Sequence, residues 1–278
     1  ILVTGAGGML GQDLLGVLKD RPDLDVTAFA RADLDVTDEA AVRAAVAGHD
    51  VVLNAAAWTD VDGAEEREAE ATAVNGGGAA NLARASRAVG ARLVHVSTDY
   101  VFRGDATSPY PEDAPTDPIN AYGRGKLAGE EAVLAAGGYV VRTAWLYGAH
   151  GRNFVTTMLR LAGERETLDV VDDQRGQPTW SWALAERLVD LALADAPPGV
   201  YHGTASGETT WYGLARAIFA RAGHDPERVR PTTSDRYVRP APRPSYSVLG
   251  HDRWARAGMA PMPDWEAMLT AYLGSPRA

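Results

Sequence analysis

Short apolar runs alternate with longer stretches of helical periodicity through the first half of the chain. The predicted strands are residues 1–4, 26–29, 51–53, 93–96 and 139–141, and the predicted helices between them are residues 9–18, 38–46, 64–89 and 122–136. Strands that are apolar on both faces and alternate with helices are typical of βαβ units in a buried parallel sheet. We therefore predict an α/β fold with a Rossmann-type doubly wound parallel sheet.

After about Gly148 this regular alternation weakens. Residues 154–162, 182–194 and 212–222 have helical patterns, residues 199–202 form a short predicted strand, and residues 231–244 are rich in Pro and Arg. The last segment is expected to be an extended surface loop. We predict a dinucleotide-binding core over residues 1–148, with a return segment near residues 180–205. Residues 149–278 are expected to form mainly a smaller, interleaved substrate-binding lobe.

Composition narrows the classes of function. The chain has 278 residues, 27 basic and 37 acidic side chains, a net charge of −10 and no cysteine. The absence of cysteine excludes disulfides, thiolate zinc sites and thiol nucleophiles. No apolar run approaches the ~20 residues of a membrane span, and the start lacks the basic region of a signal peptide. We expect a cytoplasmic protein with no membrane partner. Because phosphate binding requires a basic surface, an acidic chain also argues against a nucleic-acid partner.

A glycine-rich loop joins the first strand to the first helix. Gly5, Gly8 and Gly11 permit a tight turn, close approach of backbone to a pyrophosphate and close helix–strand packing. The N-terminus of the following helix then binds phosphate through its N–H groups and dipole. The spacing is G-x-x-G-x-x-G, since Leu10 interrupts the commoner G-x-G-x-x-G. A plain turn is the alternative, but the position after the first strand favours a cofactor loop.

Arg31 follows the second predicted strand. NAD-selective sites usually carry a carboxylate there for the ribose 2′-hydroxyl, whereas an Arg accommodates a 2′-phosphate. This position therefore favours NADPH, with NADH as the alternative. The other interpretation of Arg31 is a solvated surface side chain.

Candidate catalytic groups lie further along the chain. Tyr122 and Lys126 are four residues apart and share one face of a predicted helix. An ammonium group beside a Tyr favours ionisation of the phenol, so we expect Lys126 to lower the pKa of Tyr122. Thr98 follows a buried strand, at whose carboxyl end α/β folds bind ligands. Its hydroxyl is suited to polarise a substrate carbonyl.

These segments resemble the extended short-chain dehydrogenase/reductases, and more narrowly the dTDP-4-dehydrorhamnose reductase family. The similarity runs nearly end to end. It includes the glycine loop and residues 54–59, 97–102, 122–126, 142–145, 153–154, 173–179, 201–202 and 243–247.

The resemblance implies specific roles for residues of this chain. Thr98, Tyr122 and Lys126 are expected to form the catalytic group. The residues expected to contact the cofactor, together with the glycine loop, Arg31 and the catalytic pair on the helix, are Met9, Leu10, Asp35, Val36, Ala57, Trp58, Thr59 and Val96. Those expected to face the substrate are Thr98, Asp99, Tyr100, Trp145, Asn153 and Arg243. Asp35 as a capping residue before Thr37, and Trp145 as a core aromatic, remain alternatives.

One position separates reductases from the similar sugar 4,6-dehydratases. Dehydratases carry an Asp-Glu pair after the Thr, whereas here Asp99 is followed by Tyr100. A phenol cannot replace a carboxylate base at neutral pH. Carbonyl reduction is therefore expected rather than elimination.

Two positions depart from the family pattern. Some members bind Mg²⁺ through glutamates at a dimer interface, but here only Asp13 matches one such ligand and Ala196 occupies the second position. The sequence therefore does not favour a metal-bridged dimer. Tyr246 stands where an Asn is usual, which leaves details of the substrate lobe open.

The resemblance implies reduction of the C4 keto group of a dTDP-4-dehydro-6-deoxyhexose by NADPH, with Tyr122 as the acid. Arg243, or Arg239 on the same loop, is the candidate clamp for the nucleotide diphosphate, since Arg suits bidentate phosphate contacts. The alternatives are a reductase of a different 4-keto sugar nucleotide, or a non-catalytic NADP(H)-binding regulatory protein. The sequence leaves the oligomeric state open, a homodimer included.

Overall fold

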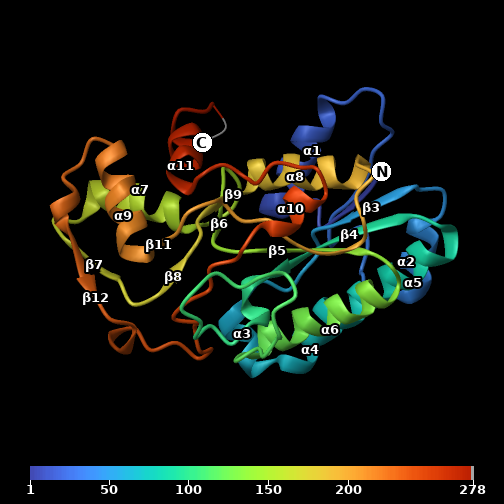
Figure 1. Cartoon of the computed structure of the whole chain (residues 1–278), viewed down its shortest axis with the longest axis horizontal. Helices are drawn as coiled ribbons and strands as arrows, with labels where there is room; N and C mark the ends of the chain where they lie inside the picture. Colours follow the sequence, from blue (N-terminus) through green and yellow to red (C-terminus); the bar gives the residue numbers. More distant parts are fainter. Residues whose placement is uncertain (277–278) are drawn as a thin grey trace.

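A six-stranded, wholly parallel sheet forms the centre of the computed structural model, which describes residues 1–276 (Figure 1). Its strand order is β10-β5-β4-β3-β1-β2. The strands are β1 (Leu2–Thr4), β2 (Thr27–Phe29), β3 (Val51–Asn54), β4 (Arg92–Thr98), β5 (Tyr139–Thr143) and β10 (Gly199–His202). The predicted Rossmann-type fold is confirmed.

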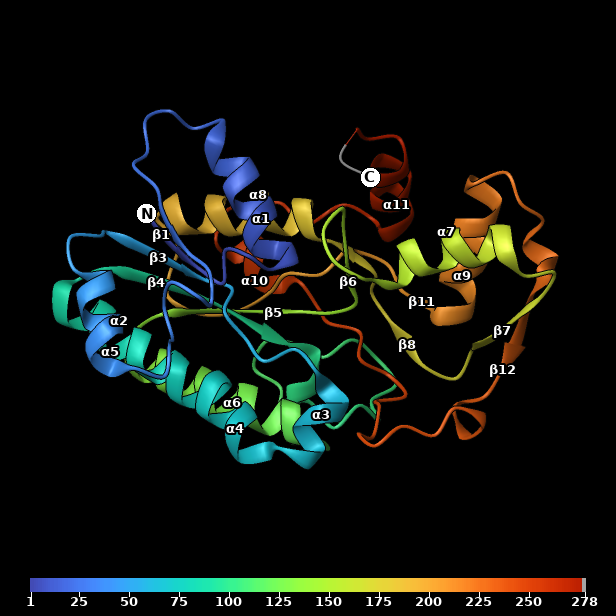
Figure 2. The same cartoon turned by 180° about the vertical axis from the view of Figure 1, so that it is seen from behind.

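Helices cover both faces of this sheet, which explains the apolar runs within its strands. α1 (Met9–Lys19), α8 (Ser181–Leu193) and α10 (Asp252–Arg256) lie on one side (Figure 2). The opposite side carries α2 (Glu39–Val46), α3 (Val61–Glu66), α4 (Glu68–Thr72), α5 (Ala79–Val89) and α6 (Ala121–Ala135). One buried cluster therefore forms on each face, around Leu14 and Leu188 on the first and around Leu82 and Val140 on the second.

Several short elements gather beyond the carboxyl ends of the central strands (Figure 2). Three two-stranded pairs form there: β7 (Leu168–Val171) with β12 (Val229–Thr232), β8 (Arg175–Gly176) with β11 (Thr209–Thr210), and β6 (Leu146–Tyr147) with β9 (Thr179–Trp180). The helices of this region are α7 (Phe154–Glu164), α9 (Trp211–Arg221) and α11 (Trp265–Leu273). The division of the chain into two domains near residue 148 stays a prediction.

Two sequence expectations are wrong in detail. The single helix predicted over residues 64–89 is three helices, because the backbone at Arg67 leaves the helical region and a π-helical turn follows over Ala73–Gly78. Three consecutive glycines in this turn allow close packing: a Cβ at Gly78 would lie 2.6 Å from the Val36 side chain. The predicted loop 231–244 begins with the last two residues of β12 and contains a single 3₁₀ turn at Ser234–Arg236.

Among residues 1–276, helices long and apolar enough to cross a membrane are absent.

Candidate active site

The glycine loop after β1 forms a tightly packed cradle. Gly5 has φ +73°, and a Cβ there would lie 2.5 Å from the backbone of Ala55 and Ala56 on the neighbouring strand connection. A Cβ at Gly11 would lie 2.2 Å from the Gly5 carbonyl oxygen. Only glycine therefore fits at these two positions. Gly5 permits the turn, and Gly11 permits the close contact between α1 and the end of β1.

The N-terminus of α1 fits a phosphate group. Gly8 occupies the N-cap position and has no side chain to accept from the first N–H groups of the helix. These N–H groups and the helix dipole therefore remain available to an anion. Met9 and Leu10 begin the helix at this point. The cradle thus fits the pyrophosphate of a dinucleotide cofactor, as the sequence predicted.

A second loop, between β2 and α2, carries the residues that were expected to contact the cofactor ribose. Arg31 and Asp35 are both exposed. Asp35 accepts from the backbone N–H and the hydroxyl of Thr37 at 2.9 and 2.7 Å. These two hydrogen bonds lower the pKa of Asp35, and the charge of Arg31 acts in the same direction. Asp35 thus forms a local turn with Thr37, whereas the residue that caps α2 is Asp38, and Arg31 is exposed at the surface.

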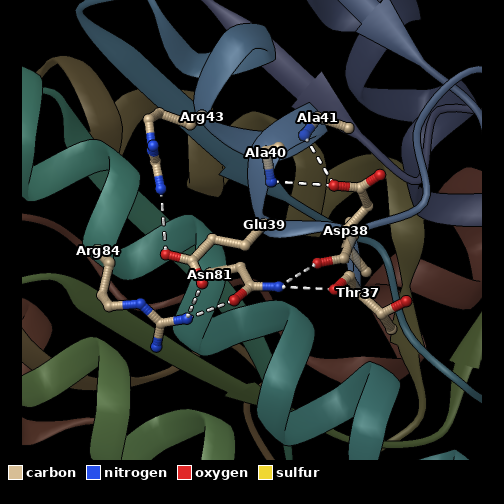
Figure 3. Close-up of polar contacts among 9 residues, drawn as sticks. Thr37, Asp38, Glu39, Ala40, Ala41, Arg43, Asn81 and Arg84 are labelled. Atoms are coloured by element: carbon tan, nitrogen blue, oxygen red, sulfur yellow. Dashed lines mark hydrogen bonds and ion pairs between the residues drawn. The ribbon is translucent and has the colours of Figure 1, made fainter.

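Helix α5 holds this second loop in place (Figure 3). The Asn81 amide donates to the carbonyl oxygens of Val36 and Thr37 at 2.9 and 3.1 Å. Arg84 donates to the Asn81 carbonyl oxygen and lies 3.5 Å from the Glu39 carboxylate. Asp38 caps the following helix by accepting from Ala40 and Ala41 (Figure 3). Backbone and side-chain contacts thus fix the loop that carries Val36.

A third loop, after β3, carries Ala57, Trp58 and Thr59. Asn75, in the π-helical turn, binds both polar groups of the Trp58 backbone, accepting from its N–H at 2.9 Å and donating to its carbonyl oxygen at 3.1 Å. The guanidinium of Arg67 lies over the Trp58 ring, 4.3 Å from its centroid. The three loops follow β1, β2 and β3. The predicted cofactor residues that these loops carry therefore lie together at the carboxyl ends of neighbouring strands.

The predicted catalytic residues meet at the end of β4. Thr98 is the last residue of that strand, and its hydroxyl donates to the Asp99 carboxylate at 2.9 Å. Tyr122 lies in the first turn of α6, which Asn120 caps by accepting from the Gly123 N–H at 2.8 Å. The Thr98 hydroxyl lies close enough to the Tyr122 phenol to lower the pKa of that phenol. The hydroxyl groups of the expected Thr and Tyr are therefore neighbours.

Burial has the largest effect on the pKa of Tyr122. Burial raises the pKa of Tyr122, the Asp99 charge raises it further, and the Thr98 hydroxyl only partly opposes them. Lys126 donates to the Val96 carbonyl oxygen at 2.6 Å, and burial lowers its own pKa to about 8. Burial and the nearby carboxylate thus determine the phenol's acidity here.

Tyr100 and Asp99 complete this end of the sheet. The Tyr100 ring meets the Tyr122 ring edge to face, with 6.0 Å between centroids. Burial raises the pKa of Asp99 to about 6, although hydrogen bonds from Ser247 and Thr98 partly oppose this shift. Burial also raises the pKa of Tyr100, so this phenol stays protonated.

A cavity of about 810 Å³ lies near this group, because Arg243, one of its lining residues, has its guanidinium 6.0 Å from the centroid of the Tyr100 ring. It lies between α7, α9, β7 and the loop after β12, and its lining includes Phe154, Met158 and Trp211. The Trp211 ring stacks on Trp145, which follows β5. The lining also includes Asp62, Arg239 and Arg243. The cavity thus combines apolar side chains with two arginines.

Arg243 is held at this cavity by Asp62 of α3. Its guanidinium lies 3.0 Å from the Asp62 carboxylate and donates to the Ala241 carbonyl oxygen at 2.8 Å. Arg239 lies 3.7 Å from the same carboxylate. Asn120 also donates to the Pro242 carbonyl oxygen at 3.0 Å, which ties this loop to the start of α6. A single carboxylate therefore faces both candidate phosphate-binding arginines.

Other predicted positions are engaged within the protein. Asn153 caps α7 by accepting from Thr156 at 3.0 Å, and its amide donates to the Gly148 carbonyl oxygen at 2.8 Å. Asp13 is buried and accepts from the Ser181 hydroxyl at 2.5 Å. Ala196 is buried, and its carbonyl oxygen accepts from the Tyr139 hydroxyl at 2.6 Å. Among residues 1–276, groups of three or more His, Asp or Glu side chains arranged to hold a metal ion are absent.

Sequence reasoning did not identify Asp62, Asn75 or Trp211. Trp211 is an aromatic residue next to the start of a predicted helix, which could have drawn attention to it. No sequence pattern, however, connected Trp211 to Trp145. Asn75 lies in the segment that was predicted as one helix, and Asp62 lies just before that segment. Their orientation could not be derived without the break at Arg67 and the π-helical turn.

The fold and the arrangement at β4 and α6 define an oxidoreductase of the extended short-chain dehydrogenase/reductase class. Residues 1–277 match the family described as RmlD substrate binding domain, and the chain belongs to that family. The predicted family is confirmed.

Named relatives are similar over almost their whole length. A dTDP-4-dehydrorhamnose reductase from Streptomyces griseus is 56% identical, with 97% of this chain and 91% of the relative covered. A dTDP-4-keto-6-deoxy-D-glucose reductase from Streptomyces niveus is 54% identical, with 97% and 94% covered. A dTDP-4-dehydrorhamnose reductase from Bacillus anthracis, solved in complex with NADP, superposes with a TM-score of 0.92 at 38% identity, covering 98% of this chain and 97% of that one.

Proposed function

We propose that this protein reduces the C4 keto group of a dTDP-4-dehydro-6-deoxyhexose with NADPH, and that dTDP-4-dehydrorhamnose is its substrate. The observation that carries this proposal is the meeting of Thr98 and Tyr122 at the carboxyl end of β4, beside the glycine cradle of β1. The names of relatives at 54–56% identity support the substrate class. The NADP in the Bacillus anthracis structure supports the cofactor.

The proposed residues have distinct roles in the reduction. The bound nicotinamide supplies a hydride, which forms the new C–H bond at C4 as the carbonyl π bond breaks. The Thr98 hydroxyl, which donates to Asp99 in the free protein, would turn its hydrogen to the substrate carbonyl oxygen and stabilise the negative charge that develops there. Tyr122 gives its phenolic proton to the same oxygen, so the product is an alcohol and Tyr122 is left as a phenolate that solvent reprotonates. The raised pKa of Tyr122 keeps the phenol protonated until substrate binds.

We place the cofactor along the three loops that follow β1, β2 and β3. The α1 N-terminus at Gly8 binds the pyrophosphate, Arg31 the 2′-phosphate, and Lys126 with Val96 the nicotinamide ribose. The sugar nucleotide occupies the cavity beside Trp211, with Arg243 at its diphosphate. Met9, Leu10, Val36, Ala57, Trp58 and Thr59 line the cofactor, and Asp99, Tyr100 and Trp145 face the sugar.

Tyr100 supports reduction over elimination. Its phenol is half-buried against Tyr122, and burial raises its pKa well above the ordinary value. Removing a proton from a sugar carbon requires a base that is ionised at neutral pH. Tyr100 does not supply one, which separates this site from that of a dehydratase.

A direct assay tests the proposal and its closest competitor. NADPH oxidation is followed at the nicotinamide absorption band with dTDP-4-dehydro-β-L-rhamnose and, separately, with dTDP-4-dehydro-6-deoxy-D-glucose, and NMR identifies each product. We expect faster turnover with the first compound and dTDP-L-rhamnose as its product. Faster turnover of the second compound would instead indicate the activity for which the Streptomyces niveus relative is named. NADPH binding without turnover of either compound contradicts the proposed reduction. A cytoplasmic location stays a prediction from the sequence, and the oligomeric state, a homodimer included, stays open.

A further inference from the structure

A chain of buried polar side chains runs from Lys126 through the interior of the sheet. The Lys126 amine lies 3.3 Å from Nε2 of His95, and Nδ1 of His95 lies 2.7 Å from the Asn54 amide nitrogen. The Asn54 carbonyl oxygen accepts from the Thr4 hydroxyl at 2.7 Å. All four side chains are buried, on α6, β4, β3 and β1. The proposed reaction uses only Lys126, so the other three need a separate explanation.

The orientation of the Asn54 amide follows from a backbone contact. The Ala56 N–H donates to the Asn54 carbonyl oxygen at 3.0 Å. A backbone N–H can only donate, so the amide oxygen must lie on that side and the amide nitrogen must face His95. The amide nitrogen is itself only a donor. His95 Nδ1 therefore accepts this hydrogen bond and carries no hydrogen.

The tautomer of His95 is then determined. A neutral imidazole without hydrogen on Nδ1 carries its hydrogen on Nε2, the atom that faces Lys126. An imidazolium is disfavoured because it would place an N–H against the Asn54 amide. Burial also holds the pKa of His95 well below its ordinary value. His95 thus presents an N–H donor to the Lys126 amine.

An ammonium group cannot accept this hydrogen bond, because all of its nitrogen valences are occupied. A neutral amine has a lone pair that can accept from His95, and it still donates to the Val96 carbonyl oxygen at 2.6 Å. The two protonation states of Lys126 therefore differ in how well they fit the same surroundings. The neutral state satisfies both neighbours, and the charged state places two donors against each other.

We infer that His95 is a positioning residue, held by Asn54 with its hydrogen on Nε2, which donates to Lys126 and destabilises the ammonium form relative to the neutral amine in the free protein. The inference deepens the proposed function, since it concerns a residue of the proposed catalytic group. It gives Lys126 a protonation equilibrium near neutral pH. Lysine can then gain or lose a proton during turnover, which an ordinary lysine does not do at that pH.

The other charges around Lys126 do not account for such a preference. Glu130, one turn further along α6, raises the pKa of Lys126. Its carboxylate is paired with Arg142 of β5 at 2.7 Å. Glu68 of α4 is paired with Arg124. Tyr122 and Asp99 lie at the same end of α6 as Lys126, and Asn75 of the π-helical turn is uncharged. Burial has the largest effect on the pKa of Lys126, and His95 is the neighbour whose N–H further destabilises the ammonium form.

The composition of the chain permits a direct measurement. Lys19 and Lys126 are its two lysines, and Lys19 is exposed at the end of α1. Protein grown with ¹³C- and ¹⁵N-labelled lysine therefore has two side-chain signals, one of which is an internal reference. Titration of the free protein by NMR yields the midpoint of Lys126 without cofactor, substrate or turnover. We expect this midpoint at about pH 8 in the wild type.

Two variants separate the hydrogen bond from packing. His95→Asn keeps an oxygen that accepts from Asn54 but removes the N–H at Lys126, so the Lys126 midpoint should rise by about one pH unit or more. His95→Gln keeps an N–H near the Nε2 position, and its midpoint should stay within a few tenths of the wild-type value. An unchanged midpoint in His95→Asn, or equal rises in both variants, overturns the inference.

The tautomer is tested in the wild type, which needs no variant to fold. In protein labelled with ¹⁵N-histidine, the His95 ring should show a hydrogen on Nε2 and none on Nδ1. A hydrogen on Nδ1 overturns the inference. These spectra do not depend on turnover, so failure of the proposed reaction and failure of this inference are distinguishable.

Discussion

The Trp145 ring stacks on the Trp211 ring with 3.6 Å between centroids and 8° between planes, although the Trp145 backbone lies at φ +48°. A non-glycine residue in this region is strained, and the surrounding structure must hold it there. Gly176 forms part of that surrounding, because a Cβ there would lie 2.6 Å from the Trp145 ring. The strained backbone thus holds the Trp145 indole against Trp211, which lines the cavity.

Gly176→Ala should therefore displace the Trp145 ring. Overpacking of this kind costs about 1–3 kcal/mol. We expect the KM for the sugar nucleotide to rise roughly tenfold while the KM for NADPH is unchanged, because only the substrate cavity is altered. Gly163→Ala on α7 is the matched control, since a Cβ there has open space around it. Steady-state kinetics of both variants measure this effect. Identical KM values for the sugar nucleotide in Gly176→Ala and Gly163→Ala would reject the role of Trp145.

Arg243→Ala should weaken substrate binding. Charge-assisted hydrogen bonds contribute about 1.5–3 kcal/mol, so the KM for the sugar nucleotide should rise at least tenfold. Arg230→Ala, an exposed position on β12, is the control for loss of a positive charge. Equal KM values for Arg243→Ala and the wild type would show that the diphosphate is held elsewhere.

Asp99 gives the stability of the protein a defined pH dependence. Burial raises its pKa to about 6 from 3.8, so the folded protein holds this proton more tightly than the unfolded chain. The contribution of Asp99 to the free energy of unfolding therefore falls as the pH rises from about 4 to about 6, by roughly 1.4 kcal/mol for each pH unit in that range. Asp99→Asn should remove this slope. Urea unfolding of both proteins between pH 4 and pH 7 measures it, and a pH-independent difference would contradict the assignment.

Arg31→Ala should change cofactor choice. If Arg31 binds the 2′-phosphate, its loss lowers kcat/KM for NADPH and leaves that for NADH nearly unchanged, so the ratio should fall about tenfold. Arg21→Ala, at the far end of α1 with an exposed partner 3.6 Å away, is the control. A ratio unchanged in Arg31→Ala returns Arg31 to the role of a surface side chain.

The sheet and its loops could be predicted because each of their signals is local. The central strands are buried on both faces, so their apolar runs stand out, and the glycines that admit no Cβ mark the first loop directly. Thr98 could be placed at the carboxyl end of a strand, where such sheets bind ligands, and its grouping with Tyr122 followed from the family resemblance. The confirmed fold and family rest on these patterns.

Other features could not be derived from local patterns. The two-residue strands β8 and β11 are too short to show any periodicity. Asp62 and Arg243 are far apart in the chain, and their contact depends on how the loop after β12 returns to α3. The pKa of Tyr122 was expected to fall because Lys126 is four residues away, but the sequence does not show the burial that raises it.

Replacement of Tyr122 by Phe tests the proposed reduction most directly. The variant keeps the ring that packs against Tyr100 and removes only the hydroxyl that donates the proton. NADPH oxidation with dTDP-4-dehydro-β-L-rhamnose should fall by about 10²–10⁴-fold in kcat, whereas the Kd for NADPH measured by fluorescence titration should match the wild type. Turnover within a factor of a few of the wild-type rate would contradict the assignment of Tyr122 as the acid.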